Sequence, residues 1–433
     1  MRNLPQAFLD RMKKQLPETE WESFLRVYDE APLKGLRVNP LKCGRGWFLV
    51  RRLFVTEPVA WEENGFYLGE EKAGAHPYHF AGAYYLQEPS AMCAAPLLGV
   101  KKGEKVLDLC SAPGGKGTRL AADLEGEGLI VLNEPIPSRA KILLENVERL
   151  GITNAVVSCA YPKELSKKFL SYFDKIMVDA PCSGEGMFRK NEKEAIGEWS
   201  EENVLLCAQR QAEILDEATK MLRLGGRLVY STCTFAEAED EGQVREYLKK
   251  HPEMRLMKEY KLYPHKIKGE GHYAALFEKV EEGEIAKMAP VKTFVSSARK
   301  KEYAKFHEAL FSTPVFDRLH EVGDKLYALP EDAFDFAKMD VLRVGVKLGE
   351  FVNGRFVPAH ALAACTKIDA CKNAVDMPAH DSRVDKYLRG DTFEAEGADG
   401  WCIVFVDGIS LGWGKRVGGV VKNHYPKGLR KVK

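Results

Sequence analysis

The chain has 433 residues, of which 45% are hydrophobic and 29% are charged, a composition typical of globular proteins that excludes a mainly disordered chain. Its length predicts about three domains, and its net charge of +1 selects no class of partner. Because the sequence has neither 18 consecutive apolar residues nor an apolar leader, we expect a cytoplasmic protein without a membrane segment.

The first 55 residues predict a small helical region. Apolar side chains recur there at spacings of three and four, which places them on one face of a helix. These residues are Phe8, Leu9, Met12, Leu16, Trp21, Phe24, Leu25 and Tyr28. Lysine and arginine outnumber the acidic residues in this region, so this end of the chain is basic.

From about residue 104, short β-branched segments alternate with longer amphipathic segments. We predict strands at 105–109, 129–132, 155–158, 175–178 and 227–231, and helices at 116–124, 137–150, 200–223 and 237–250. This alternation is typical of βαβ units, so the expected fold class is α/β, with a parallel sheet at its centre. Functional groups are then expected in the loops at the carboxyl ends of the strands.

The loop after the first of these strands has the sequence VLDLCSAPGGKGTRLA. It is not a phosphate-binding P-loop, because Cys110 stands where that motif requires glycine. Asp108 ends the strand, and a turn through Gly114 and Gly115 leads into a helix, so a ligand can approach backbone N–H groups closely. Such a loop suits a ligand with a carboxylate and a cationic centre.

The second strand ends at Glu134, where an acid can accept hydrogen bonds from ribose hydroxyls. Taken alone, an acid such as Glu134 is more often a helix cap or a surface residue. Together with Asp108 and the glycine turn, however, it predicts a nucleoside that carries an amino-acid end and a positive charge. That cofactor is S-adenosylmethionine.

Two cysteines follow later strands, Cys182 in DAPCSGEGM and Cys233 in YSTCTF. The ten cysteines form no CxxC pair, so we expect no metal site, and most should be small buried residues. These two, however, share a sheet edge with the expected methyl donor. A thiolate that adds to C6 of a pyrimidine makes C5 nucleophilic enough to accept a methyl group, and Lys116 is a nearby cation that could favour the thiolate.

The last part of the chain predicts a small β-rich domain. Polar residues at 279–292 indicate a domain boundary, and short alternating segments with many glycines follow from about 346. The end of the chain, WGKRVGGVVKNHYPKGLRK, mixes aromatic residues with cations. A run of charge alone is more often a solvated tail, but this mixture also suits stacking on bases and neutralising phosphates, so nucleic acid is the leading partner class.

Several segments resemble the RNA (cytosine-5) methyltransferases of the NOL1/NOP2/Sun family, most closely the bacterial branch that acts on 16S ribosomal RNA. They are VLDLCSAPGGKGTRLA, NEPIPSRAKILLENVERLG, VDAPCSGEGMFRK, YSTCTF and YYLQEPSAM, with RVNPLK near the start and LGWGKRVGGVVKNHYPKGLR at the end. The resemblance implies a Rossmann-like methyltransferase core that uses S-adenosylmethionine. It also implies an N-terminal RNA-binding segment at 1–75, a catalytic domain at 76–283, a connecting region at 284–345 and a PUA-like RNA-binding domain at 346–433.

The resemblance also implies roles for individual residues. Cys233 is the nucleophile, Cys182 assists release, and Asp179 lies near both the cofactor and the base, with Lys116 beside the catalytic groups. The cofactor is expected along Cys110, Ser111, Ala112, Pro113, Gly114, Gly115 and Lys116, with Glu134 and Asp179. The residues expected to bind RNA are Arg37, Asn39, Lys415, Arg416, Lys422, His424, Tyr425, Lys427 and Arg430.

One position departs from the family pattern. Tyr161 follows the third strand, where the family usually carries an aspartate that contacts the adenosine of the cofactor. We expect Tyr161 to stack or hydrogen-bond in its place, or the contact to be missing, and cofactor affinity is the property that this change affects.

Three other functions fit parts of the sequence. One is a tRNA cytosine-5 methyltransferase, which would use the same chemistry. A second is a non-catalytic RNA-binding factor in ribosome assembly, against which the paired Cys182 and Cys233 argue. A third is a small-molecule methyltransferase, which would leave the basic ends of the chain without a role.

Overall fold

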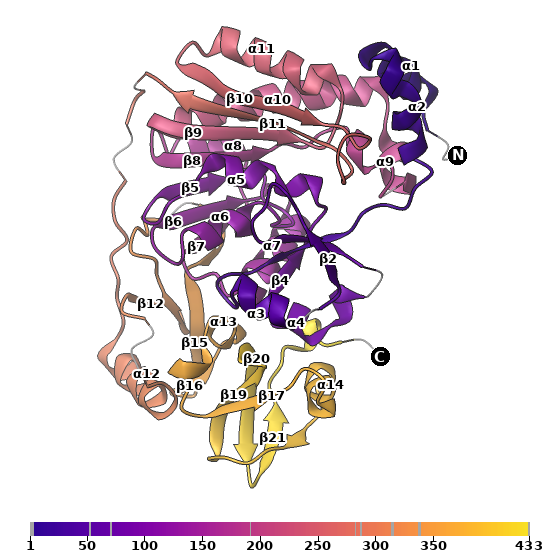
Figure 1. Ribbon diagram of the computed structural model, residues 1–433. Coiled ribbons are helices and arrows are strands. Elements are labelled where there is room, and N and C mark those ends of the chain that lie inside the picture. The colour runs from indigo at the N-terminus through magenta and orange to yellow at the C-terminus, as the bar shows by residue number, and fades with distance from the viewer. Residues whose placement is uncertain are drawn as a thin grey trace.

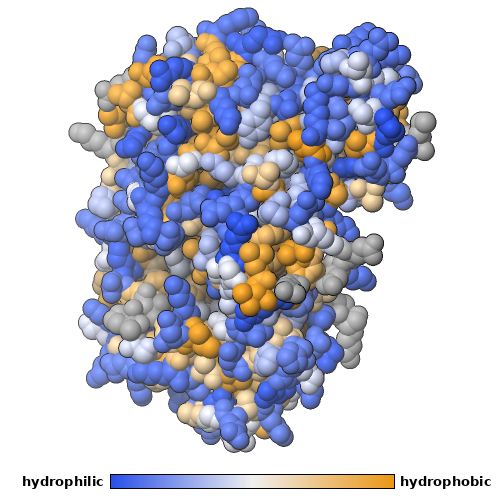
Figure 2. Space-filling model, viewed as in Figure 1, coloured by the Kyte–Doolittle hydropathy of each residue, from blue (hydrophilic) through white to orange (hydrophobic). Residues whose placement is uncertain are grey.

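The computed structural model describes residues 4–51, 53–69, 72–190, 192–281, 283–285, 288–312, 316–336 and 339–431. Figure 1 shows an α/β region in the upper and central part of the molecule, with the C-terminal sheets below it. Hydrophilic residues predominate on the face drawn in Figure 2, among scattered groups of apolar residues, as on most protein surfaces. No helix within the described ranges is long and apolar enough to cross a membrane.

The centre of the fold is an eight-stranded sheet with the order β10-β11-β9-β8-β5-β6-β7-β14. Its strands are β5 (Lys105–Asp108), β6 (Leu129–Asn133), β7 (Ala155–Ser158), β8 (Phe173–Asp179), β9 (Leu222–Thr232), β10 (Met254–Leu262), β11 (His272–Lys279) and β14 (Val341–Val344). The strands from β5 to β9 pair in parallel, whereas β10, β11 and β14 pair antiparallel to their neighbours. The predicted α/β core and its five parallel strands are therefore confirmed.

Helices cover both faces of this sheet. They are α5 (Ala94–Leu98), α6 (Gly117–Asp123), α7 (Pro137–Arg149), α8 (Pro162–Ser166), α10 (Glu201–Met221) and α11 (Glu241–Lys250). Helix α9 (Glu192–Glu198) packs instead with the N-terminal helices. Leu120 of α6 and Leu143 of α7 are buried in one cluster with Ile130 and Val157, while Leu215 of α10 packs in a second cluster. The second cluster also holds alternate residues of the same strands, as expected for a sheet buried on both sides.

The N-terminal region is helical only in its first part. Helices α1 (Gln6–Gln15) and α2 (Glu18–Val27) pack against the loops after β8 and β9, where Phe8 contacts Phe188 with ring centroids 5.0 Å apart. The helical prediction to residue 55 is wrong beyond α2, because a four-stranded sheet follows, interrupted by the short helix α3 (Arg45–Val50). Its strands are β1 (Gly35–Val38), β2 (Val55–Pro58), β3 (Gly65–Leu68) and β4 (Tyr84–Leu86).

The C-terminal region is β-rich, as predicted. Helix α12 (Ser297–Leu310) precedes one sheet, of β12 (Leu319–Val322), β13 (Lys325–Ala328), β15 (Val346–Val352) and β16 (Arg355–Pro358). After α13 (His360–Ala364), a second sheet contains β17 (Ala374–Met377), β18 (Phe393–Glu394), β19 (Gly400–Val406), β20 (Ile409–Val417) and β21 (Val420–Asn423), with α14 (Ser382–Arg389) beside it.

Strand pairing crosses two of the predicted domain limits. Strand β4 follows residue 75 yet pairs with β1, and β15 follows residue 345 yet pairs with β13. Gly345 separates β14, in the central sheet, from β15, and its positive φ of 57° together with the close Ala328 carbonyl leaves no room for a side chain. The boundaries at 75, 283 and 345 stay predictions.

Candidate active site

A cavity of about 1240 Å³ lies at the carboxyl edge of the central sheet. The loops that follow the parallel strands form much of its wall, as the βαβ pattern predicts, and the segment before α5, helix α10 and the start of β11 complete it. Among the predicted site residues that line it are Cys110, Ser111, Ala112, Pro113, Gly115, Lys116, Glu134, Asp179, Cys182 and Cys233. Gly114 does not line the cavity; its φ of 113° forms the turn, and it packs against Leu143.

The loop after β5 is held from outside by three side chains. Arg37 donates to the Gly115 carbonyl at 2.6 Å, Arg139 to the Ala112 carbonyl at 2.9 Å, and Asn146 to the Pro113 carbonyl at 2.9 Å. These contacts hold the carbonyl groups of the loop in place.

Asp108 is the buried acid of this loop, with a fully buried side chain. Among the described residues, its carboxylate oxygens and the Ser111 hydroxyl make no hydrogen bond of good geometry, although Ser111 lies close enough to lower the pKa of Asp108. Burial raises the pKa of Asp108 to about 7. A cationic ammonium group is the ligand that such a carboxylate would bind most favourably.

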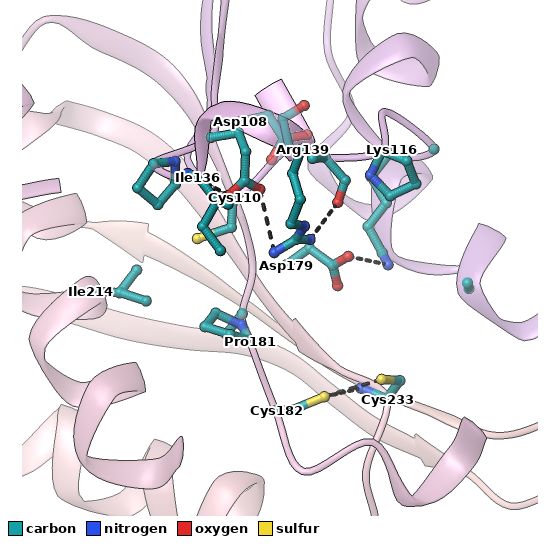
Figure 3. Close-up of a pocket in the computed structure, with 18 of the residues that line it drawn as sticks. Asp108, Cys110, Lys116, Ile136, Arg139, Asp179, Pro181, Cys182, Ile214 and Cys233 are labelled. Carbon is teal, nitrogen blue, oxygen red and sulfur yellow. Dashed lines mark hydrogen bonds and ion pairs between the residues drawn. The ribbon is translucent and has the colours of Figure 1, made fainter. Parts of the chain in front are cut away.

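Glu134 lies at the end of β6 and is 1% exposed. One of its carboxylate oxygens accepts from the Ile136 amide at 3.0 Å, and the other lies 3.5 Å from Arg139. In Figure 3 the apolar side chains of Ile136, Pro181 and Ile214 lie on the side of the cavity away from Lys116. Apolar walls beside two acids fit the adenine, ribose and amino-acid parts of S-adenosylmethionine.

Tyr161 lines the same cavity and is 67% exposed. Its backbone N–H donates to the Glu164 carboxylate at 3.0 Å, and this hydrogen bond caps the start of helix α8. The largely exposed Tyr161 side chain therefore stands at the rim of the cavity, just before helix α8.

Asp179 and Lys116 form an ion pair of 2.8 Å inside the cavity (Figure 3). Asp179 also accepts a hydrogen bond of 2.8 Å from Ser231. Burial alone would raise the pKa of Asp179, but Lys116 and its other neighbours hold that pKa below its usual value, and Asp179 in turn raises the pKa of Lys116. Both groups are therefore charged at neutral pH, and Lys116 is compensated by Asp179 rather than free to act on a thiol alone.

The two predicted cysteines meet across the cavity, with sulfur atoms 3.1 Å apart (Figure 3). Both are free thiols, and the Cys233 amide donates to the Cys182 sulfur at 3.3 Å. The contact with Cys233 and burial raise the pKa of Cys182 well above its usual value. Cys182 is therefore a protonated thiol at neutral pH.

The loops that carry the cysteines are linked to each other. The Ser183 and Thr234 hydroxyls are 2.8 Å apart, and buried Glu185 accepts from the Phe235 amide at 3.1 Å. Arg11 of α1 pairs with the same Glu185 at 2.5 Å. The N-terminal helices thus help to fix the distance between the two thiols.

Sequence reasoning missed several residues of this cavity. Gln87 and Glu88 line it and belong to YYLQEPSAM, the segment that carried part of the resemblance, so a signal for them existed. Arg139 and His272 also line it. His272 stands alone in the sequence, and no motif marks it as a site residue.

Four of the residues predicted to bind RNA have buried side chains in the folded chain. Arg37 and Asn39 are 4% and 6% exposed, and Asn39 donates to the carbonyls of Gly82 and Leu150. Arg416 is fully buried, and Tyr425 is 3% exposed. These residues hold the fold together, and a basic or aromatic residue type alone did not reveal that role.

The other predicted RNA contacts include an exposed group on the last sheet. Lys415, Lys422, His424 and Lys427 are exposed, and Arg430 is partly buried. Trp401, Lys415 and Lys422 are direct neighbours across β19, β20 and β21, and the His424 ring lies 4.6 Å from that of Trp401. We name Trp401, Lys415, Lys422 and His424 the cation–aromatic patch.

Family models match most of the chain. Residues 95–278 match the model described as 16S rRNA methyltransferase RsmB/F, and residues 4–89 match the N-terminal domain of 16S rRNA methyltransferase RsmF. Residues 305–365 match the first C-terminal domain of RsmF rRNA methyltransferase, and residues 374–431 match the methyltransferase RsmF PUA domain.

Individual proteins give the same result. Ribosomal RNA small subunit methyltransferase F of Vibrio vulnificus (strain YJ016) is 30% identical, over 98% of this chain and 97% of that protein. The corresponding protein of Shewanella sp. (strain MR-4) is 30% identical, over 100% and 98%. A solved methyltransferase homologue from Pyrococcus horikoshii has a TM-score of 0.58 at 26% identity, over 64% of this chain and 96% of that one.

Asp108 is expected to make cofactor binding depend on pH. Its carboxylate is about half ionised near pH 7, so affinity for S-adenosylmethionine should rise severalfold between about pH 6 and pH 8. Asp108→Asn should bind more weakly and lose this pH dependence in calorimetric titrations.

The same substitution has an opposite effect on stability. Because the pKa of Asp108 is higher in the folded chain than its usual value of 3.8, ionisation of this buried group destabilises the cofactor-free protein as the pH rises through about 4 to 7. Asp108→Asn should therefore gain thermal stability over the wild type as the pH increases. A variant that binds the cofactor normally at pH 8 would contradict the assignment.

Glu134→Ala is expected to weaken S-adenosylmethionine binding by roughly ten- to a hundredfold, because hydrogen bonds to a charged group contribute about 1.5–3 kcal/mol. RNA affinity should stay close to that of the wild type. Glu145→Ala, at an exposed position of α7, is the matched control for both titrations. Unchanged cofactor affinity in Glu134→Ala would exclude a ribose contact.

Proposed function

The chain belongs to the RsmB/F family of 16S rRNA methyltransferases, and on this premise we propose that it methylates carbon 5 of a cytosine in 16S ribosomal RNA through a covalent bond to Cys233. It is an RNA methyltransferase that depends on S-adenosylmethionine. The observation that carries the cytosine-5 chemistry is the pair of thiols 3.1 Å apart in the cavity with the cofactor residues. Because its substrate is ribosomal RNA, we place the reaction in the cytoplasm.

Cys233 starts the proposed reaction. Its thiolate attacks C6 of the cytosine, and the electrons of the C5–C6 bond become available at C5, which takes the methyl group. S-Adenosylmethionine supplies that group as an electrophile. The proton on C5 then leaves, the C5–C6 double bond forms again, and the bond from C6 to the Cys233 sulfur breaks.

Cys182 fits the release step. Its raised pKa keeps it protonated, and its sulfur lies within hydrogen-bond distance of the sulfur that leaves C6. A protonated thiol in this position can donate a hydrogen bond to the departing Cys233 thiolate and so stabilise it. The same protonation makes Cys182 a poor nucleophile.

Asp179 and Lys116 line the same cavity as the two thiols. Because each compensates the charge of the other, Asp179 is available as a carboxylate, which can accept hydrogen bonds from the amino group of a cytosine. These roles of Asp179 and Lys116 are part of the proposal.

Ribosomal RNA is favoured over tRNA as substrate. Four domain models of 16S rRNA methyltransferases match along the chain, and the relatives that match it over nearly its whole length carry the name ribosomal RNA small subunit methyltransferase F. Bisulfite sequencing of 16S rRNA and tRNA from cells with and without the gene tests this choice. Loss of a tRNA signal alone would favour the tRNA enzyme.

Substituting the two cysteines is expected to have different effects on the reaction. Cys233→Ala should abolish methylation without forming an adduct, because the attacking sulfur is gone. Cys182→Ala should accumulate a covalent protein–RNA adduct, because attack proceeds and release fails. Denaturing gels with labelled RNA distinguish the two results.

Cys159→Ala is the matched control for the cysteine variants. Cys159 follows β7 at the same sheet edge and is partly buried, but it does not line the cavity. The Cys159→Ala variant should methylate RNA at the wild-type rate. An adduct in Cys233→Ala instead of Cys182→Ala would reverse the assigned roles.

The cation–aromatic patch is proposed as an RNA-docking surface. Replacing both Lys415 and Lys422 by alanine should weaken RNA binding and reduce the slope of log affinity against log salt by about 1.4 to 1.8, since each lost phosphate contact contributes about 0.7 to 0.9. Cofactor affinity should not change. The control replaces Lys220 and Lys249, two exposed lysines of α10 and α11, by alanine. An equal loss of RNA affinity in the control would show that binding depends on the total charge of the protein and not on the cation–aromatic patch.

A further inference from the structure

His272 is a buried histidine in the wall of the active-site cavity. Its side chain is 1% exposed, and neither ring nitrogen has a hydrogen-bond partner among the described residues. Two unsatisfied nitrogens in a buried ring are unfavourable for folding alone. A ligand that enters the cavity can satisfy them.

The surroundings keep this ring uncharged. Burial, together with the positive charge of Lys116, lowers the pKa of His272 to about 3, although Asp179 opposes the shift. A neutral imidazole carries one N–H donor and one acceptor nitrogen. A group that is so hard to protonate is a poor proton acceptor at neutral pH, which argues against a role as general base.

The register of the sheet brings His272 next to the nucleophile. His272 is the first residue of β11, and Tyr273 pairs with Thr232 of the antiparallel strand β9. His272 precedes Tyr273 and Cys233 follows Thr232, so in this antiparallel pairing His272 and Cys233 lie opposite each other at the same edge of the sheet. His272 therefore faces the region in which the reacting base must lie.

The segment before His272 is held rigidly. Arg189 and Glu270 form a buried ion pair of 2.7 Å. The amide of Glu270 donates to Glu88 at 2.9 Å, and the amide of Gly271 donates to Ser90 at 3.1 Å. Two segments far apart in the sequence thus fix the backbone at His272.

Gly271 completes this arrangement. Its φ of 103° is a conformation that residues with a side chain rarely adopt, and the Phe235 ring occupies the space that a Cβ would need. Glu88 and Ser90 belong to the segment YYLQEPSAM, which no other step of the proposed reaction uses. Holding His272 in place gives that segment a function.

We propose that His272 recognises the target base by donating a hydrogen bond from its neutral ring to an acceptor on the polar edge of the cytosine, which sets C6 against the Cys233 sulfur. Enzymes that act on a base commonly extrude it into a pocket and bind that edge. The neutral imidazole N–H can donate to the carbonyl oxygen or ring nitrogen of the cytosine, while the charged Asp179 can accept from its amino group. The inference rests on the proposed cytosine-5 reaction.

The test uses two variants of the full-length enzyme. His272→Phe keeps a ring of similar size and removes both polar nitrogens, whereas His272→Gln keeps a donor and an acceptor. Three properties are measured for each: kcat/KM with a 16S rRNA transcript, the Kd for S-adenosylmethionine, and the midpoint of thermal unfolding. The rate of covalent trapping by a transcript that contains 5-fluorocytidine reports the attack by Cys233 without the later proton loss.

For His272→Phe we expect kcat/KM and the trapping rate to fall about ten- to a hundredfold. The Kd for S-adenosylmethionine should stay within about twofold, and the unfolding midpoint should be unchanged or higher, because two unsatisfied buried nitrogens are gone. His272→Gln should recover a substantial part of both rates. A merely structural histidine would lose activity together with stability.

Three results would overturn the inference. They are activity of His272→Phe within about twofold of the wild type, an equal loss in His272→Gln and His272→Phe, and a loss of cofactor affinity that matches the loss of activity. A wild-type enzyme that leaves no bisulfite-resistant cytosine in the transcript would instead refute the proposed function, so the two failures are distinguishable.

Discussion

The ion pair between Lys116 and Asp179 connects the parts of the active site. Lys116 belongs to the loop after β5, Asp179 ends β8, and Ser231 of β9 donates to the same carboxylate. Burying either charge alone would be costly, so removing one partner leaves the other uncompensated. The loop that forms the cofactor site and the strands that lead to the two thiols are therefore held in a common geometry.

The N-terminal region supports that geometry from outside the central sheet. Arg37 reaches the carbonyl of Gly115, and Arg11 reaches Glu185 between the cysteine-bearing loops. Both arginines thus bind a loop of the active site. The N-terminal region thus has a structural function in the enzyme, whatever RNA surface it also offers.

The sequence predicted what depends on local pattern and failed where distant segments meet. Alternating strands and helices located the parallel sheet, and since functional loops follow such strands, Cys182 and Cys233 were expected at one edge. The sheet of β1 to β4 was missed because its strands have only three or four residues each, and their pairing with one another is not visible in the local sequence pattern. Arg37 and Arg416 were predicted to bind RNA, because a charge in a sequence does not show whether its side chain is buried. His272 is brought to Cys233 by antiparallel pairing of β9 and β11, which no motif in the sequence encodes.

Strand β14 has a consequence for how the protein is made. It pairs with β7 and covers what would otherwise be an open edge of the central sheet, yet it follows the whole catalytic segment in the chain. During synthesis on the ribosome, β5 to β9 emerge well before β14, and the edge of β7 stays available to other strands until β14 arrives. Because Gly345 directly follows β14 and turns the chain into the next sheet, completion of the catalytic core is coupled to the start of the C-terminal region. A nascent chain that stalls before β14 would expose a strand edge prone to aggregation.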